Sequence, residues 1–135
     1  MPIRTYIDSG VLIFASQGTS EAAALALPFI TDKNREYITS DYIKIEVLPK
    51  AIFFKKKNEV DFYNTFFAMN VRCMPPSSAL MQFAMEEACK TGMSGIDALH
   101  VACAAFGGAQ EFVTNEKNTK PVHRTALVKV VSIFP

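Results

Sequence analysis

Short runs of apolar and β-branched residues alternate with longer helical patterns along this chain. The runs are bounded by turn residues, and each is too short for a buried helix, which favours strands. The predicted strands are residues 3–7, 37–39, 71–74, a short segment that ends in 114–116, and 127–133. Asp8-Ser9-Gly10 ends the first strand, and Pro75-Pro76 stops the third.

The segments between these strands carry helix signals. Ser20, Ser77 and either Ser40 or Asp41 stand where an N-cap is expected, and Thr91-Gly92 is a helix terminator. The predicted helices are residues 11–15, 20–30, a helix from 40 or 41 that contains Glu46 and closes at 55–58, then 60–69, 77–90 and 97–106. Pro28 and Pro49 fall inside two of these patterns, and a bend or break is expected at each.

Strands separated by helices predict an α/β fold with a central, mainly parallel sheet of four to five strands and right-handed crossovers. The length of 135 residues fits one domain over residues 1–135, with enough chain for a core without disulfides. No repeat, linker or low-complexity tract interrupts the pattern. The small-residue run from Ala98 to Phe106, followed by Gly107-Gly108, indicates a helix that packs closely against the sheet.

The composition limits the classes of protein to which this chain can belong. Half of the residues are hydrophobic and the net charge is only +1, so phosphate binding would need a local basic patch. No apolar segment approaches the ~20 residues of a membrane span, and the start does not resemble a signal peptide, which predicts a soluble cytoplasmic protein. Cys73, Cys89 and Cys103 are odd in number and lack CxxC spacing, so we expect reduced core thiols.

Four carboxylates stand where this fold collects ligands, outside the carboxyl ends of parallel strands. Asp8 directly follows the first strand, and Glu116 lies just beyond the fourth. Glu46 and Asp97 lie in the first turns of helices that are entered from loops. Carboxylates gathered in apolar surroundings repel one another unless a cation binds, and Mg²⁺ or Mn²⁺ prefers such ligands.

Each acid also has a simpler interpretation. Asp8 can begin a turn or cap a helix, and Ser94 with Asp97 has the spacing of a capping box. Glu46 can pair with Lys50 on an exposed helix face, and Glu116 can be a surface residue. None of the four residues is specific alone.

Together they match a family. YIDSGVLIFA, YITSDYIKIEV and SGIDALHVACAAFGGAQEFVTNE follow one another from residue 3 to 116. In this order they resemble the PIN domain, in particular the VapC-like toxin ribonucleases of toxin–antitoxin pairs. The third segment, with its G-x-D-A-x-H-x-A-x-A helix and V-T-N-acid strand end, is the most specific. The resemblance implies a three-layer α/β/α domain and a metal-dependent endoribonuclease.

The resemblance also implies the site. Asp8, Glu46 and Asp97 match the first three metal-site acids, while Glu116 stands where the family usually has an aspartate. Glutamate is one methylene longer, and the usual Asp-Phe that follows is replaced by 117–119. Ser9 and Thr114 match hydroxyl positions that orient carboxylates or waters. The implied cofactor is Mg²⁺ or Mn²⁺, the products are a 5′-phosphate and a 3′-hydroxyl, and the implied partners are a second copy of the chain and a small antitoxin.

The remaining polar residues are interpreted more simply. His100 is expected to be a packed helix histidine rather than a ligand, and His123 lies in an uninformative loop. Three cations soon after Glu116 are candidates for RNA phosphate contacts: Lys117, Lys120 and Arg124. The Phe and Met residues between 53 and 85 are expected to be mostly core. An excess among them, such as Phe62, Phe66 and Phe67, could instead form a dimer face or an antitoxin groove.

Two rival functions stay open. One is a PIN-like domain that has lost catalytic strength and binds RNA or a protein partner, which the departure at Glu116 favours. The other is a phosphoryl-transfer or receiver-type domain with Asp8 as acceptor. That chemistry favours a second acid close after the first strand, and Asp8-Ser9-Gly10 lacks one.

Overall fold

The apolar runs pair into one five-stranded sheet in the computed structural model, which describes residues 1–17 and 20–135. Its order is β3-β2-β1-β4-β5, and every neighbouring pair is parallel. The strands are β1 (Ile3–Ile7), β2 (Arg35–Ser40), β3 (Arg72–Met74), β4 (Glu111–Thr114) and β5 (Lys129–Ser132). The predicted parallel α/β fold is confirmed.

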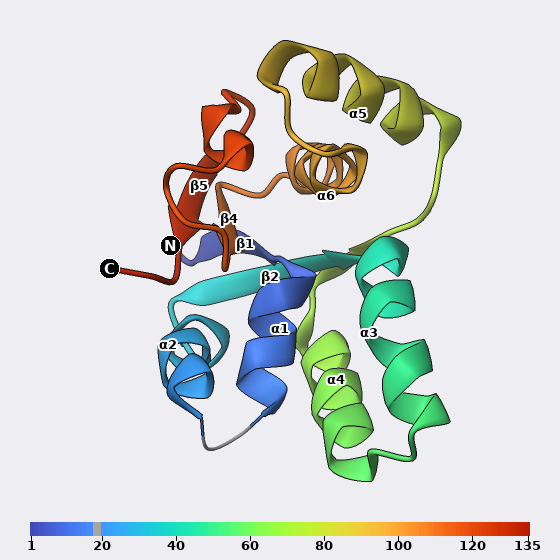
Figure 1. Cartoon of the computed structure of the whole chain (residues 1–135), viewed down its shortest axis with the longest axis vertical. Coiled ribbons are helices and arrows are strands. Elements are labelled where there is room, and N and C mark those ends of the chain that lie inside the picture. The colour runs from blue at the N-terminus through green and yellow to red at the C-terminus, as the bar shows by residue number, and fades with distance from the viewer. Residues whose placement is uncertain (18–19) are drawn as a thin grey trace.

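Helices cover both faces of this sheet (Figure 1). The helices are α1 (Ser9–Ser16), α2 (Glu21–Ile30), α3 (Asp41–Phe53), α4 (Lys57–Met69), α5 (Ser78–Thr91) and α6 (Gly95–Phe106), with a 3₁₀ turn η1 (Pro121–Arg124). Helices α5 and α6 lie on one face, and α1 to α4 lie on the other (Figure 1). The chain therefore forms the three layers that the family resemblance implies.

The strand order reverses at the centre of the sheet. From β1 the chain builds outward through β2 and β3, then returns so that β4 pairs with the other side of β1. In open parallel sheets, ligands bind at such a switch point, outside the carboxyl ends of the strands. Asp8 leaves β1 and Thr114 ends β4, so both residues stand beside this position.

The cap signals located the helix starts well. The Ser40, Ser77 and Ser20 hydroxyls accept the backbone N–H three residues on, at 3.1–3.2 Å. Ser40, rather than Asp41, is thus the cap of α3. Gly92, with φ +76°, closes α5 in the left-handed conformation that favours glycine.

The helix breaks considered at Pro28 and Pro49 do not occur. Helix α2 continues past Pro28 to Ile30, and α3 continues past Pro49 to Phe53. Both prolines lie on exposed sides of their helices, where water can satisfy the carbonyl that loses its partner. Helix α4 also begins earlier than predicted, at Lys57, so the lysine run starts that helix instead of closing α3.

Helix α6 is the most deeply buried of the helices described. Its residues from Ala98 to Ala104 are all buried, and a Cβ on the following Gly107 would lie 2.8 Å from the Ile38 side chain. The small residues therefore bring the helix close to β2, as the sequence predicted. Among the described residues, no single helix is long and apolar enough to cross a membrane; α1 and α2 meet that criterion only when taken together as a bent pair.

The cysteine prediction was half correct. All three thiols are free, and Cys103 is buried in α6. Cys73 and Cys89 are exposed, however, because one lies on the edge strand β3 and the other on the outer side of α5.

Candidate functional site

Asp8 is held firmly at the end of β1. It is 7% exposed, and its carboxylate accepts the Ser9 backbone N–H at 2.8 Å and the Thr114 hydroxyl at 3.1 Å. Burial raises the pKa of Asp8, and the charge of Asp97 raises it further, while the His100 ring and the two hydrogen bonds counteract the rise. Asp8 is therefore the N-cap of α1 and also a buried carboxylate near a second acid.

Asp97 approaches the same place from α6. It is half-buried in the first turn of the helix, and its backbone N–H donates to the Ser94 hydroxyl at 3.1 Å. Ser94 is thus the cap, and the carboxylate of Asp97 is near enough to raise the pKa of Asp8. The structure brings these two acids together although they are far apart in the sequence.

Glu46 has a partner that the sequence did not suggest. Its Oε1 atom pairs with Nε2 of the buried His100, rather than with Lys50 on the helix surface. The side chain of Glu46 keeps 36% of its surface exposed, so the carboxylate lies at the boundary between the core and solvent. His100 is 1% exposed, which confirms the prediction of a packed histidine.

Glu116 joins the edge through its backbone. Its N–H donates to the Thr114 hydroxyl at 3.1 Å, and the same hydroxyl donates to Asp8. Thr114 therefore contacts the Asp8 carboxylate through its hydroxyl, whereas Ser9 contacts it through its backbone N–H. The Glu116 residue is half-buried, which argues against a purely surface role.

The four acids thus lie along one edge of the sheet, but they do not form a compact cluster. Asp8 lies close to Asp97, Glu46 is turned toward His100, and Glu116 follows Thr114. Within residues 1–17 and 20–135, no three His, Cys, Asp or Glu side chains stand close enough together to hold a metal ion. The arrangement supplies the donor types for a hard cation, and Asp97 is near enough for its charge to raise the pKa of Asp8.

The predicted phosphate contacts divide into two kinds. Lys117 and Lys120 are exposed in the loop after Glu116. Arg124 instead donates to the carbonyl of Thr91 at 2.8 Å and so fastens this loop to the end of α5. Arg124 is thus engaged within the fold, whereas the two lysines are exposed to solvent.

Sequence reasoning missed two contacts of the Glu116 loop. His123 Nε2 donates to the Glu116 carbonyl at 3.0 Å, so the ring supports the acid's backbone. A Cβ on Gly10 would lie 2.3–2.6 Å from three atoms of the Asn115 side chain, which packs directly on the start of α1. The glycine of Asp8-Ser9-Gly10 and the asparagine of Thr114-Asn115-Glu116 were visible signals, but only the fold shows that they meet.

A hollow of about 230 Å³ opens beside Glu46, between α1, α3 and α4. Lys50 and Lys56 line it together with Glu59 and Tyr63. Lys50, which the sequence offered as an ion-pair partner of Glu46, instead borders the space next to that acid. Two cations therefore flank the hollow on this side of the acidic edge.

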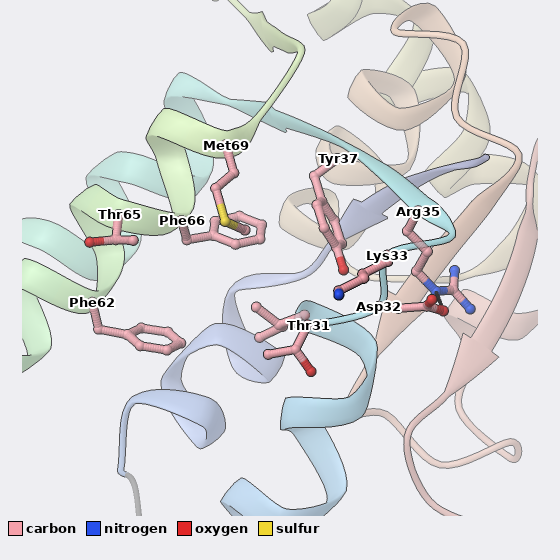
Figure 2. A pocket seen from close by; sticks show the side chains of 10 residues that line it. Thr31, Asp32, Lys33, Arg35, Tyr37, Phe62, Thr65, Phe66 and Met69 are labelled. Carbon is pink, nitrogen blue, oxygen red and sulfur yellow. Dashed lines mark hydrogen bonds and ion pairs between the residues drawn. The ribbon is translucent and has the colours of Figure 1, made fainter.

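A larger cavity of about 520 Å³ lies away from the acids, beside the start of β2. Figure 2 shows Phe62, Phe66 and Met69 of α4 on one side and Tyr37 and Lys33 on the other. Phe66 is a core residue at 2% exposure, whereas Phe62 is only partly buried. The aromatic excess that the sequence showed thus contributes both to the core and to this cavity.

Sequence comparison finds no matching family model and no matching curated protein. Structure comparison does find matches, which cover nearly the whole chain. The chain of a Klebsiella pneumoniae toxin–antitoxin complex matches with a TM-score of 0.74 at 17% identity, over 96% of this chain and 98% of that chain. VapBC2 of Rickettsia felis, solved with a DNA fragment of its promoter, matches with a TM-score of 0.71 at 15% identity, over 96% and 98%.

A third match is VapC20 of Mycobacterium tuberculosis, described as a sarcin–ricin loop cleaving toxin. Its TM-score is 0.66 at 14% identity, over 93% of this chain and 98% of that chain. The chain therefore has the fold of the VapC-type PIN domains, as the sequence resemblance predicted. At such identities the likeness establishes the fold alone, and activity must be argued from the residues.

Proposed function

We propose that this chain is a metal-dependent endoribonuclease and the toxin of a toxin–antitoxin pair. The observation that carries the proposal is the pairing of Asp8 and Asp97 at the switch point of the sheet, with Glu46 and Glu116 on the same edge. The fold shared with VapC20, a toxin that cleaves the sarcin–ricin loop, supports the choice of RNA as substrate.

The residues present fit a hard divalent cation. Asp8 is buried, its pKa is raised, and the neighbouring Asp97 is one cause. A cation between the two carboxylates would remove their repulsion, and oxygen donors are the ligands that Mg²⁺ and Mn²⁺ prefer. Asp8 and Asp97 would hold the ion, with Glu46 and Glu116 acting directly or through water.

Each residue then has a physical task. Such an ion, when bound, lowers the pKa of water and stabilises charge on a phosphate and a leaving oxygen. Thr114 and the Ser9 N–H hold the Asp8 carboxylate in one orientation. Lys117 and Lys120 are exposed in the adjacent loop, where their charges can attract the RNA backbone.

The test is RNA cleavage with and without divalent ions. The purified chain is incubated with structured RNA plus Mg²⁺ or Mn²⁺, with a chelator as control, and the ends of the products are analysed. We expect cleavage that needs the ion and leaves a 5′-phosphate and a 3′-hydroxyl. Ion-independent cleavage with a 2′,3′-cyclic phosphate would contradict the proposal, because it indicates attack by the ribose hydroxyl.

A second candidate function is RNA or protein binding without catalysis. Two observations favour it: Glu46 is turned toward His100, and a glutamate replaces the usual aspartate at 116. RNA binding by electrophoretic shift, without cleavage in any divalent ion, would support this alternative. Cleavage that Asp97→Asn abolishes would exclude it.

Partners form part of the proposal. Four large apolar residues of α3 and the turn after it are more than half exposed: Ile45, Ile52, Phe53 and Phe54. Exposed apolar patches on a compact protein mark surfaces for partners. This patch supports a homodimer, and the matched toxin–antitoxin complex supports an antitoxin partner. The mass of the chain by light scattering, alone and with an upstream-encoded partner, tests both.

A further inference from the structure

A buried chain of hydrogen bonds runs from the cap of α3 to Glu46. The Ser40 hydroxyl accepts the Ile43 N–H at 3.2 Å and contacts the Tyr6 hydroxyl at 2.7 Å. Tyr6 in turn contacts His100 Nδ1 at 2.8 Å, and His100 Nε2 pairs with Glu46. The three side chains between the backbone and the carboxylate are at most 1% exposed, so water does not compete with them.

This chain of hydrogen bonds joins the elements that position three of the four acids. Tyr6 lies on β1 two residues before Asp8, and His100 lies on α6 three residues after Asp97. Glu46 lies on α3, whose first turn Ser40 caps. A single imidazole therefore ties the carboxylate of α3 to the two elements that bring Asp8 and Asp97 together.

The number of protons that each group can donate sets the direction of this hydrogen-bond chain. If each hydroxyl has one proton to give, Ser40 donates to Tyr6, Tyr6 donates to Nδ1, and the remaining ring proton on Nε2 goes to Glu46. In the reverse direction Ser40 would accept from both Ile43 and Tyr6. Its own proton would then be left for the neighbouring Cys103 thiol, which is a weak acceptor.

We infer that His100 is a positioning residue, held by Tyr6 and Ser40 in the Nε2–H tautomer so that it fixes the Glu46 carboxylate at the acidic edge. A bond from a neutral donor to an ionised carboxylate is strong, and it restricts a long side chain that is otherwise partly exposed. One oxygen of Glu46 is used in this bond and the other stays free for the site. The inference rests on the proposed function for its catalytic consequence, but the tautomer stands on geometry alone.

The first measurement is therefore independent of activity. The chain contains two histidines, so the ¹⁵N spectrum of the imidazoles shows two rings, and His123→Gln assigns them. We expect His100 to carry its proton on Nε2, with Nδ1 unprotonated. In Tyr6→Phe the Nδ1 resonance should move, because its donor is lost. A wild-type ring that carries a proton on Nδ1 would overturn the inference.

The second measurement separates positioning from simple packing. His100→Leu keeps an apolar body without a donor, whereas His100→Gln keeps an N–H donor near the place of Nε2. We expect His100→Leu to lower kcat by roughly 10- to 100-fold with little change in KM, as for lost supports of metal ligands, and His100→Gln to recover most of it. Melting temperatures identify variants that fail to fold, and Tyr6→Phe then supplies the kcat comparison.

The proposed function and the inference about His100 can be contradicted independently of each other. If wild type neither cleaves RNA nor binds Mn²⁺, the proposed function fails, while the tautomer still decides whether His100 holds Glu46. If wild type cleaves and His100→Leu, once shown to be folded, cleaves equally well, the inference fails while the proposed function stands. Equal losses in His100→Leu and His100→Gln would also overturn it, because the retained donor would then have no value.

Discussion

The sheet has opposite charge arrangements at its amino edge, where the strands begin, and at its carboxyl edge, where they end. At the amino edge, Arg35 of β2 donates to Glu111 of β4 at 2.9 Å and pairs with Asp32 at 3.2 Å. Arg35 also donates to Thr5 of β1, and Lys129 of β5 lies 3.4 Å from the second oxygen of Glu111. Charges of opposite sign are thus paired across β2, β4 and β5, with the Thr5 hydroxyl of β1 as a further acceptor.

At the carboxyl edge, by contrast, carboxylates lie near one another. Asp8 is buried near Asp97, whose charge raises the pKa of Asp8, while the nearby His100 ring lowers it. Its hydrogen-bond partners among the described residues are the Ser9 N–H and the Thr114 hydroxyl. An edge that is fully paired serves stability, whereas an edge with repelling carboxylates is costly for the fold and useful for binding. The contrast is the main physical reason to place the function at the carboxyl edge.

The largest expected effect concerns the acidic edge. Asp97→Asn keeps the size and the backbone cap but removes one charge, so RNA cleavage should fall roughly 100- to 1,000-fold, about 3–4 kcal/mol of transition-state stabilisation. Rates at saturating Mg²⁺ check this. Asp61→Asn, which removes an exposed acid of α4, is the control and should cleave like wild type. A loss of less than about threefold in Asp97→Asn would contradict the placement of the function at the carboxyl edge.

The amino edge should respond in stability instead. Arg35→Met leaves Glu111 and Asp32 without their main partner in a largely buried setting, and should lower the free energy of unfolding by about 3 kcal/mol. Urea unfolding measures it. Lys57→Met, which breaks the exposed pair with Asp61, should change stability by less than about 0.5 kcal/mol. The folded fraction of Arg35→Met should still cleave RNA; a lost kcat would mean that the two edges are coupled.

Asp8→Asn should also change the free energy of unfolding, but by less than Arg35→Met and in the opposite direction. Because burial raises the pKa of Asp8, the folded state binds the proton more tightly than the unfolded chain does. Wild type therefore loses stability as pH rises from about the ordinary value of 3.8 through the raised pKa. Without divalent ions, the amide variant should escape this loss and be the more stable protein at neutral pH, though inactive. A stability difference that shrinks as pH rises would contradict the assignment.

The smallest effect concerns the contact between Gly10 and Asn115. In Gly10→Ala the new Cβ must displace the Asn115 amide, while alanine favours the helix, so stability should change by less than about 1 kcal/mol. Cleavage should fall a few-fold, because Asn115 stands between Thr114 and Glu116. Gly95→Ala is a matched control in the first turn of α6, where a Cβ meets open space. Equal activity of the two variants would show that Asn115 does not matter.

Local signals predicted the parts of this molecule that depend on neighbouring residues. The strand that ends at Asp8, the caps Ser40 and Ser77, and the small-residue helix after Asp97 could be predicted because turn chemistry and periodicity act over a few residues. The breaks expected at Pro28 and Pro49 were wrong, because propensity yields where a proline faces solvent and the rest of the helix is packed.

Contacts between distant residues could not be predicted in the same way. His100 and Glu46 are 54 positions apart, and Arg35 and Glu111 are 76 apart. Nothing in the local pattern of Glu46 distinguishes a partner on α6 from Lys50 one turn away on its own helix. The candidate acids could be named from the sequence, but which two lie together, and which one is held by a histidine, depends on the fold.

Mn²⁺ binding by calorimetry tests the central claim most directly, because it asks whether the acidic edge needs a cation. Wild type, Asp97→Asn and the control Asp61→Asn are titrated with Mn²⁺ in the absence of RNA. We predict binding by wild type and by Asp61→Asn, and an affinity at least tenfold weaker in Asp97→Asn. Equal binding by wild type and Asp97→Asn, or none by wild type, would contradict the account of a metal-dependent nuclease at this edge.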